Sequence, residues 1–315
     1  MIDSLVYGPV PSRRLGRSLG INNIPPKKCS YSCVYCQLGH TIDMQIARKD
    51  FYQPPELARN VMNKVKLLKD KGESIDYLAF VPDGEPTLDI NLGKEIELLR
   101  ALCIKIAVIT NASLIWSGDV QQDLKEPDRV CVKVDAVTPD IWRKINKPHP
   151  KMDLNNILQG MLDFAGSFSG ELNSETMLIK GINDSECEMS KIAAFLAKLN
   201  LTKAYLAVPT RPTAERIEPA IEQTLNASYQ VFSKKLSRVE YLTGYEGNAF
   251  TSTGKAVDDL LAITAVHPMR KDAVEELLKK SGTDWRIIQE LIDNQSLVDT
   301  EYQGKKFYIR KIPEV

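Results

Sequence analysis

Short apolar runs alternate with segments of helical periodicity along most of the chain. Seven runs of the kind found in buried strands lie near residues 17–23, 76–82, 105–110, 130–136, 174–180, 203–209 and 238–243. Between them, apolar residues recur at helical spacing within 57–68, 92–103, 154–161 and 189–199. Strands that alternate with helices predict an α/β fold with a parallel sheet. Because six such units cannot close an eight-stranded barrel, we expect an open, partial (β/α)6 barrel.

The pattern changes after residue 250. Residues 255–264, 269–280 and 283–293 predict three helices, and a hairpin with a turn at Gln303–Gly304 follows them. This order is that of a winged helix-turn-helix, so we expect two domains, 1–250 and 251–315. Winged helices commonly bind DNA, but residues 255–315 hold 10 basic and 11 acidic residues. A DNA-binding surface should be basic. We therefore expect this domain to contact protein, substrate or a second copy of the chain.

Lys and Arg total 41 and Asp and Glu total 41, so the chain has no formal net charge. No overall electrostatic attraction to nucleic acid or to a membrane surface is therefore expected. The start of the chain lacks a basic segment before a long apolar core, and no run of about eighteen apolar residues occurs. The six cysteines are not spread as a disulfide framework, which suits a reducing compartment. We expect a cytoplasmic protein that has no membrane contact.

Three cysteines, Cys29, Cys33 and Cys36, lie in one short segment, KKCSYSCVYCQLG. The spacing CxxxCxxC supplies three thiolates to a four-iron cluster and leaves the fourth iron open to a small molecule. Zinc is the alternative, since thiolates also bind zinc, but structural zinc takes four ligands. His40 is the only histidine nearby in the sequence. We expect a [4Fe–4S] cluster whose open iron is the reaction centre.

The cysteine segment, with Tyr35 directly before Cys36, resembles the cluster motif of the radical S-adenosylmethionine (SAM) superfamily. The frame GPVPSRRLGRSLGINNIPPKKCSYSCVYCQLG, together with FVPDGEPTL further along, is similar to the branch that contains the wyosine-type tRNA modification enzymes and many iron–sulfur oxidoreductases. The resemblance covers roughly the first 250 residues. No cysteine precedes Cys29, whereas the wyosine-forming enzymes carry extra upstream cysteines. This difference argues against imidazoguanosine synthesis itself.

This resemblance implies that the methionine part of SAM chelates the open iron. An electron from the cluster then cleaves the sulfonium, and the resulting 5'-deoxyadenosyl radical removes a hydrogen atom from the substrate. An electron donor of the ferredoxin or flavodoxin type is implied as a partner. A residue that acts on the substrate directly is not identified by the sequence.

A second motif, Asp83–Gly84–Glu85–Pro86, directly follows an apolar strand. By itself such a motif predicts a turn. The resemblance implies instead that Gly84 and Glu85 bind the amino group of SAM, while Asp83 stands where the family often has a first glycine. It further implies that Tyr35 lies against the adenine side of the cofactor. Asn111, at the end of the third strand, is then a candidate for adenine, ribose or substrate contacts.

The strand near 130–136 supplies an argument from alternation. Its three valines should pack against helices while Cys131, Lys133 and Asp135 point into the lumen of the barrel. Burying an ionised pair without purpose is costly. Lys133 and Asp135 are therefore candidates for the carboxylate and ribose of the cofactor, or for substrate. The alternative is an ion pair between them that only fills the lumen. We expect Cys131 to be a small core residue.

Several weaker signals leave alternatives open. The segment Arg13–Arg14–Leu15–Gly16–Arg17 suits phosphate or carboxylate recognition, and surface salt bridges explain it equally well. Lys180 is a Schiff-base candidate, although a solvated lysine is the simpler interpretation. Cys103 falls on the apolar face of its helix and should be core. Cys187 lies at an expected helix start, which can lower a thiol pKa, but an ordinary surface cysteine explains it better.

Three functions fit these sequence features. The first is a radical SAM enzyme that acts on a tRNA base or nucleoside. The second is the same chemistry on a protein or peptide, which the neutral charge and the appended domain favour. The third is an iron–sulfur, redox-sensing DNA-binding regulator. The regulator would leave the βα units and the DGEP motif unexplained, so we expect an enzyme.

Overall fold

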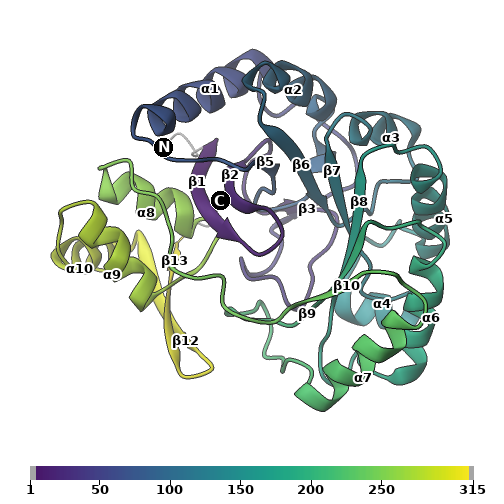
Figure 1. Ribbon diagram of the computed structural model, residues 1–315. Coiled ribbons are helices and arrows are strands. Elements are labelled where there is room, and N and C mark those ends of the chain that lie inside the picture. The colour runs from purple at the N-terminus through teal and green to yellow at the C-terminus, as the bar shows by residue number, and fades with distance from the viewer. Residues whose placement is uncertain (1–4, 312–315) are drawn as a thin grey trace.

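The computed structural model describes residues 5–311, and its main sheet curls into an open half-barrel (Figure 1). In spatial order, the eight strands of this sheet are β1 (Val6–Ser12), β2 (Gly16–Ile21), β5 (Tyr77–Phe80), β6 (Lys105–Thr110), β7 (Arg129–Lys133), β8 (Glu171–Met177), β9 (Lys203–Ala207) and β10 (Val239–Leu242). β1 and β2 form an antiparallel hairpin, and the strands that follow β2 pair in parallel. The expected α/β fold with an open sheet is confirmed. Sequence patterns do not predict β1, because Pro9 and Pro11 interrupt its apolar run.

Helices cover the outer face of the sheet (Figure 1). They are α1 (Pro54–Asp70), α2 (Leu92–Leu99), α3 (Gly118–Leu124), α4 (Pro139–Asn146), α5 (Leu154–Ala165), α6 (Glu186–Leu196) and α7 (Glu222–Ser233), with 3-10 turns η1 (Pro86–Leu88) and η2 (Arg100–Leu102). The expectation that Cys103 is a core residue is wrong. The α-helix ends at Leu99, and Cys103 is exposed with a φ of 52° where the chain turns toward β6.

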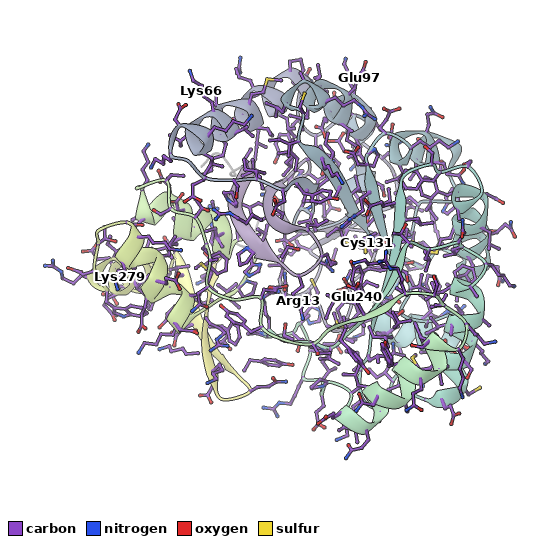
Figure 2. The ribbon with its side chains drawn as sticks, viewed as in Figure 1. Arg13, Lys66, Glu97, Cys131, Glu240 and Lys279 are labelled. Carbon is purple, nitrogen blue, oxygen red and sulfur yellow. The ribbon has the colours of Figure 1, made fainter. Side chains whose placement is uncertain are left out.

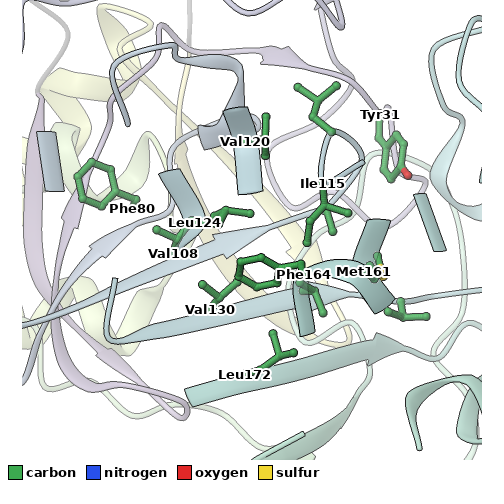
Figure 3. Packing of buried hydrophobic residues seen from close by; sticks show 14 of the residues in the cluster. Tyr31, Phe80, Val108, Ile115, Val120, Leu124, Val130, Met161, Phe164 and Leu172 are labelled. Atoms are coloured by element: carbon green, nitrogen blue, oxygen red, sulfur yellow. The ribbon is translucent and has the colours of Figure 1, made fainter. Parts of the chain in front are cut away.

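The hydrophobic core lies between the sheet and these helices. Figure 3 shows Phe80, Val108, Val130 and Leu172 from neighbouring strands, with Phe164 of α5 beside them, and all five side chains are buried. The inner face of the sheet carries a smaller cluster, made of Leu15, Tyr77, Ala79, Ala107, Ile109 and Cys131. The expected burial of Cys131 is therefore confirmed. At the carboxyl ends of the strands the inner face carries polar and charged side chains instead, among them Glu85, Lys133 and Glu175.

The last part of the chain contains three helices and a small sheet. Its elements are α8 (Ala256–Thr264), β11 (Met269–Arg270), α9 (Lys271–Lys280), α10 (Arg286–Asp293), β12 (Leu297–Tyr302) and β13 (Lys305–Arg310), with the strand order β11-β13-β12. We call residues 256–310 the C-terminal unit. It packs against β1, because Tyr7 and Val10 share one buried cluster with Leu260, Ile263 and other apolar residues of this unit. The division of the chain into two domains at residue 250 stays a prediction.

Within residues 5–311, no helix has both the length and the apolar character needed to cross a membrane.

Candidate active site

A cavity of about 250 Å³ opens at the carboxyl ends of the parallel strands, the edge where α/β proteins bind ligands. Its lining comes from segments far apart in the sequence and includes Arg13, Arg14, Cys29, Cys33, Tyr35, Cys36, Gly84, Glu85, Asn111, Lys133, Glu175, Arg211 and Glu246. Figure 2 shows Arg13 and Cys131 inside the curl of the sheet, whereas Lys66, Glu97 and Lys279 project outward from helices. The cavity thus brings together the three cysteines and most of the predicted cofactor residues.

The cysteine loop rests on the turn that follows β5. β3 (Lys28–Cys29) pairs with β4 (Asp43–Met44), and the Glu85 backbone N–H donates to the Lys28 carbonyl over 3.1 Å. Gly84 has a φ of +151°, and a Cβ atom built there would overlap the Lys28 carbonyl oxygen. Only glycine permits this close backbone approach. Gly84 therefore fixes the position of Cys29 relative to the sheet.

Side-chain amides lie beside two of the three sulfurs. Asn111 Nδ2 is 3.5 Å from Cys29 Sγ, and Asn146 Nδ2 is 3.5 Å from Cys33 Sγ. Burial, with the nearby Asp135 carboxylate second, raises the pKa of Cys33 to about 12. Thiols in such surroundings stay protonated unless a metal displaces the proton. Amide donors near the sulfurs are the kind of contact that tunes an iron–sulfur cluster.

Glu85 is buried and holds the ends of two strands together. One carboxylate oxygen accepts from the Thr87 N–H (3.1 Å), the Thr87 hydroxyl (2.6 Å) and the Thr110 hydroxyl (2.6 Å). The other oxygen accepts from the Asn111 backbone N–H over 2.7 Å. This network orients Asn111, whose side chain donates to Ser30 Oγ over 3.0 Å as well as facing Cys29. The carboxylate thus has four protein donors, which the sequence did not reveal.

Lys133 and Asp135 occupy different surroundings. Lys133 Nζ pairs with Glu175 over 3.1 Å, lies 5.0 Å from the centre of the Tyr35 ring and lines the cavity. Asp135 is buried, and it accepts from the Tyr35 hydroxyl, Asn146 Nδ2 (2.7 Å) and the Met177 N–H (2.9 Å). The alternative of an ion pair between Lys133 and Asp135 is therefore wrong. Asp135 is not among the side chains that line the cavity, and it ties the cysteine loop to β8.

The three arginines of the first hairpin separate into two environments. Arg13 and Arg14 line the cavity, where Arg13 pairs with Glu246 over 3.3 Å and Arg14 pairs with Glu175. Arg17 instead pairs with Glu73, outside the cavity. The sequence marked the segment as cationic but did not assign these acidic partners, because they lie far away along the chain.

Two other candidates lie away from the cavity. Lys180 is exposed and pairs with Glu218 over 2.5 Å, as a solvated lysine does. Cys187 is exposed near the start of α6, in agreement with an ordinary surface cysteine.

The curled α/β sheet, with a three-cysteine loop at its carboxyl edge, defines the class of protein. A family model described as the radical SAM superfamily matches residues 23–191, more than half of the chain. The chain belongs to the radical SAM superfamily, a class of enzymes whose cofactors are a [4Fe–4S] cluster and S-adenosylmethionine.

One relative is similar over nearly the whole chain, and two solved structures are similar over about 70% of it. The UPF0026 protein MJ1312 of Methanocaldococcus jannaschii is 46% identical over 312 residues, which cover 98% of this chain and 97% of that protein. Among solved structures, a radical SAM methyltransferase from Sphaerobacter thermophilus has a TM-score of 0.54 at 14% identity, over 72% of this chain and 66% of that one. A structure of TYW1 with a lysine-pyruvate adduct bound has a TM-score of 0.53 at 18% identity, over 70% of this chain and 74% of that one. At these identities the two structures show the shared fold alone.

Proposed function

We propose that Cys29, Cys33 and Cys36 hold the [4Fe–4S] cluster and that this enzyme cleaves SAM reductively to remove a hydrogen atom from a substrate. When bound, the two cofactors supply the 5'-deoxyadenosyl radical. The observation that carries the proposal is that the three cysteines line one cavity with Gly84, Asn111 and Lys133.

The residues of the chain suit distinct tasks in this proposal. Asn111 and Asn146 place amide donors beside the sulfurs of Cys29 and Cys33. Gly84 lets the backbone approach the cysteine loop, so that a ligand amino group can reach backbone carbonyls there. Lys133 lines the cavity and suits a ligand carboxylate. Tyr35 also lines the cavity, in agreement with the proposed contact to the adenine side of SAM.

The proposal is tested by measuring 5'-deoxyadenosine formation from SAM by the anaerobically reconstituted protein with a strong reductant. Cys33→Ala should abolish both product and the visible absorption of the cluster. Cys187→Ala is the matched control, because Cys187 is exposed outside the cavity, and it should retain both. A wild-type protein that holds its cluster and yet forms no 5'-deoxyadenosine would refute radical initiation.

We propose a tRNA base or nucleoside as the substrate, because the sequence frame resembles the branch of the wyosine-type tRNA modification enzymes. A protein or peptide is the second candidate, and the neutral net charge supports it. Bulk tRNA binding measured at two salt concentrations separates them, since phosphate contacts release counterions and make affinity strongly salt-dependent. Weak binding that does not change with salt would favour the protein substrate.

We propose further that the C-terminal unit is a winged helix that contacts protein, substrate or a second copy of the chain. Arg286, the first residue of α10, forms an ion pair with Asp284 over 2.6 Å. Its positive charge is thereby neutralised, so the helix offers little positive charge to DNA. Gel filtration, with and without the candidate substrate, tests for self-association. A cytoplasmic location and an electron donor of the ferredoxin or flavodoxin type stay predictions.

A further inference from the structure

Two arginines that follow strands far apart in the main sheet meet in the cavity wall. Arg13 follows β1 and Arg211 follows β9, and both contact the carboxylate of Glu246. Arg211 Nη1 also donates to Gln37 Oε1 over 2.9 Å, and Gln37 is the residue directly after Cys36. The Arg211 guanidinium therefore lies beside the cysteine loop, and Arg13 lines the same cavity and shares its carboxylate partner.

The wall around these arginines carries more positive than negative charge. We define the arginine wall as Arg13, Arg14, Lys133 and Arg211 together with their acidic partners Glu175 and Glu246, all of which line the cavity. Their ion pairs are Arg13 and Arg211 with Glu246, and Arg14 and Lys133 with Glu175. Four cations thus share two carboxylates. The arginine wall is left with an excess of two positive charges.

His267 contacts the arginine wall and adds no charge to it. Its Nε2 lies 3.0 Å from Arg211 Nη2. Because a guanidinium has no acceptor, Nε2 must accept this hydrogen bond, and the ring is therefore neutral. Burial, followed by the charges of Arg211 and Arg13, lowers the pKa of His267 well below its ordinary value.

Unused donors remain in this wall. Arg13 Nη1 and Arg211 Nε are buried and have no hydrogen-bond partner among residues 5–311. The Arg211 side chain is only 10% exposed. Burial, with the neighbouring charge of Arg13 second, lowers the pKa of Arg211 to about 9. A buried guanidinium with unpaired N–H groups is costly, and an anion that accepted them would relieve that cost.

We propose that Arg13 and Arg211 bind an anionic group of the substrate, a phosphate or a carboxylate, and hold the substrate beside the cysteine loop. The planar fork of arginine suits both groups, because each presents two or more oxygens in the spacing of its N–H donors. The inference rests on the proposed function, in which SAM occupies the same cavity. It assigns the carboxylate of SAM to another cation, Lys133, and reserves Arg13 and Arg211 for the substrate.

The test uses the anaerobically reconstituted holoenzyme with saturating SAM. Equilibrium dialysis with [33P]phosphate and, separately, [14C]malonate, at constant ionic strength, measures binding of each kind of anion. We expect saturable binding of at least one probe, and the better probe identifies phosphate or carboxylate. Arg211→Gln and Arg13→Gln should each weaken it about tenfold or more, since one charge-assisted contact has that effect. Arg17→Gln is the matched control from the same hairpin and should change nothing.

A variant that should strengthen anion binding provides a second test. Glu246→Gln removes the carboxylate that competes for both guanidinium groups, so the anion should bind several-fold more tightly. Circular dichroism and the thermal midpoint of every variant verify folding, and Arg211→Lys provides a milder change that keeps the charge. Absence of saturable binding by the wild type, or an equal loss in Arg17→Gln, would overturn the inference. So would probe binding that occurs only when SAM is omitted, because the anion site would then belong to the cofactor.

Failure of the proposed function has a different signature. If the wild type forms no 5'-deoxyadenosine while anion binding responds to Arg211→Gln as expected, the anion site stands and the radical chemistry fails. If 5'-deoxyadenosine forms but neither anion binds, the radical chemistry stands and this inference fails. Arg17→Gln, whose side chain pairs with Glu73 outside the cavity, should keep both uncoupled 5'-deoxyadenosine formation and anion binding.

Discussion

Glu85→Gln separates a structural from a ligand-binding role of this carboxylate. The resemblance of the sequence implies that Glu85 binds the amino group of SAM, whereas the structure gives its oxygens four protein donors. The glutamine side chain keeps the shape and replaces one oxygen by an NH2 group. Placed at the oxygen that faces Asn111, this group would point at the half-buried Asn111 N–H and lose that hydrogen bond.

The expected loss of stability follows from these contacts. An unsatisfied buried N–H costs about 1–3 kcal/mol, and three bonds that lose an ionised acceptor cost roughly 0.5 kcal/mol each. Burial raises the pKa of Glu85 and the hydrogen bonds oppose it, so a neutral side chain avoids part of the desolvation cost. We expect a net destabilisation of about 2 kcal/mol, which lowers the thermal midpoint by roughly 4–8 °C.

The assay combines the thermal midpoint of the reconstituted protein with the SAM dissociation constant from equilibrium dialysis. Glu97→Gln, on the exposed side of α2 (Figure 2), is the matched control and should leave both values unchanged. If the role of Glu85 is structural, Glu85→Gln should lower the thermal midpoint. SAM affinity should then change only to the extent that the substitution displaces Asn111. An unchanged midpoint together with a large loss of SAM affinity would refute the reasoning and restore the role that the resemblance implies.

Three further substitutions test other parts of the structure. Gly84→Ala should overlap the Lys28 carbonyl and lower the iron content per chain after reconstitution; a normal content would contradict the role of the turn. Asn146→Ala removes a donor to Cys33 Sγ and should lower the cluster reduction potential in an EPR-monitored titration; an unchanged potential would exclude that contact. Burial, followed by the charge of Asp89, raises the pKa of Glu95 from 4.5 to about 10. Between these two pH values the folded state keeps a proton on Glu95 that the unfolded state has lost, so the free energy of unfolding falls as pH rises from 4.5 to about 10. Glu95→Gln should therefore be more stable than the wild type at pH 8, by about 2 kcal/mol in urea unfolding, and no more stable near pH 4; a constant difference would contradict this.

Local periodicity predicted the parts of the fold that repeat an apolar pattern over several turns. The helix α1 is an example, because Leu57, Val61, Val65 and Leu68 are all buried on one face. Prediction failed where the apolar signal is short, as in α4, which buries only a few side chains. It also failed at Cys103, where helical spacing continues past the residue at which the helix ends. Tertiary contacts decide such boundaries, and they are not encoded in local spacing.

The candidate site divides in the same way. Cys29, Cys33 and Cys36 lie within eight residues, so their shared role could be inferred from spacing alone. The partners of the arginines could not, because Arg13 and Glu246 are 233 residues apart. Alternation along β7 indicated that Lys133 faces the lumen, but the sequence could not show that its partner is Glu175 on the neighbouring strand. Side-chain direction follows from local geometry, whereas partner choice follows from the order of strands in the sheet.

The two halves of the cavity differ in where their residues come from. The cysteine loop and the turn after β5 lie within residues 23–191, which match the superfamily model, whereas Arg13, Arg14, Arg211 and Glu246 of the arginine wall lie outside that range. The C-terminal unit contacts both halves, because Gln37, directly after Cys36, donates to the Val266 carbonyl over 3.1 Å and His267 contacts Arg211. Under the proposal that Arg211 binds a substrate anion, substitution of Glu246 or His267 should change anion binding, because both contact Arg211. The three cysteines lie elsewhere in the sequence and stay unchanged, so cluster content measured on the same variants separates the two effects.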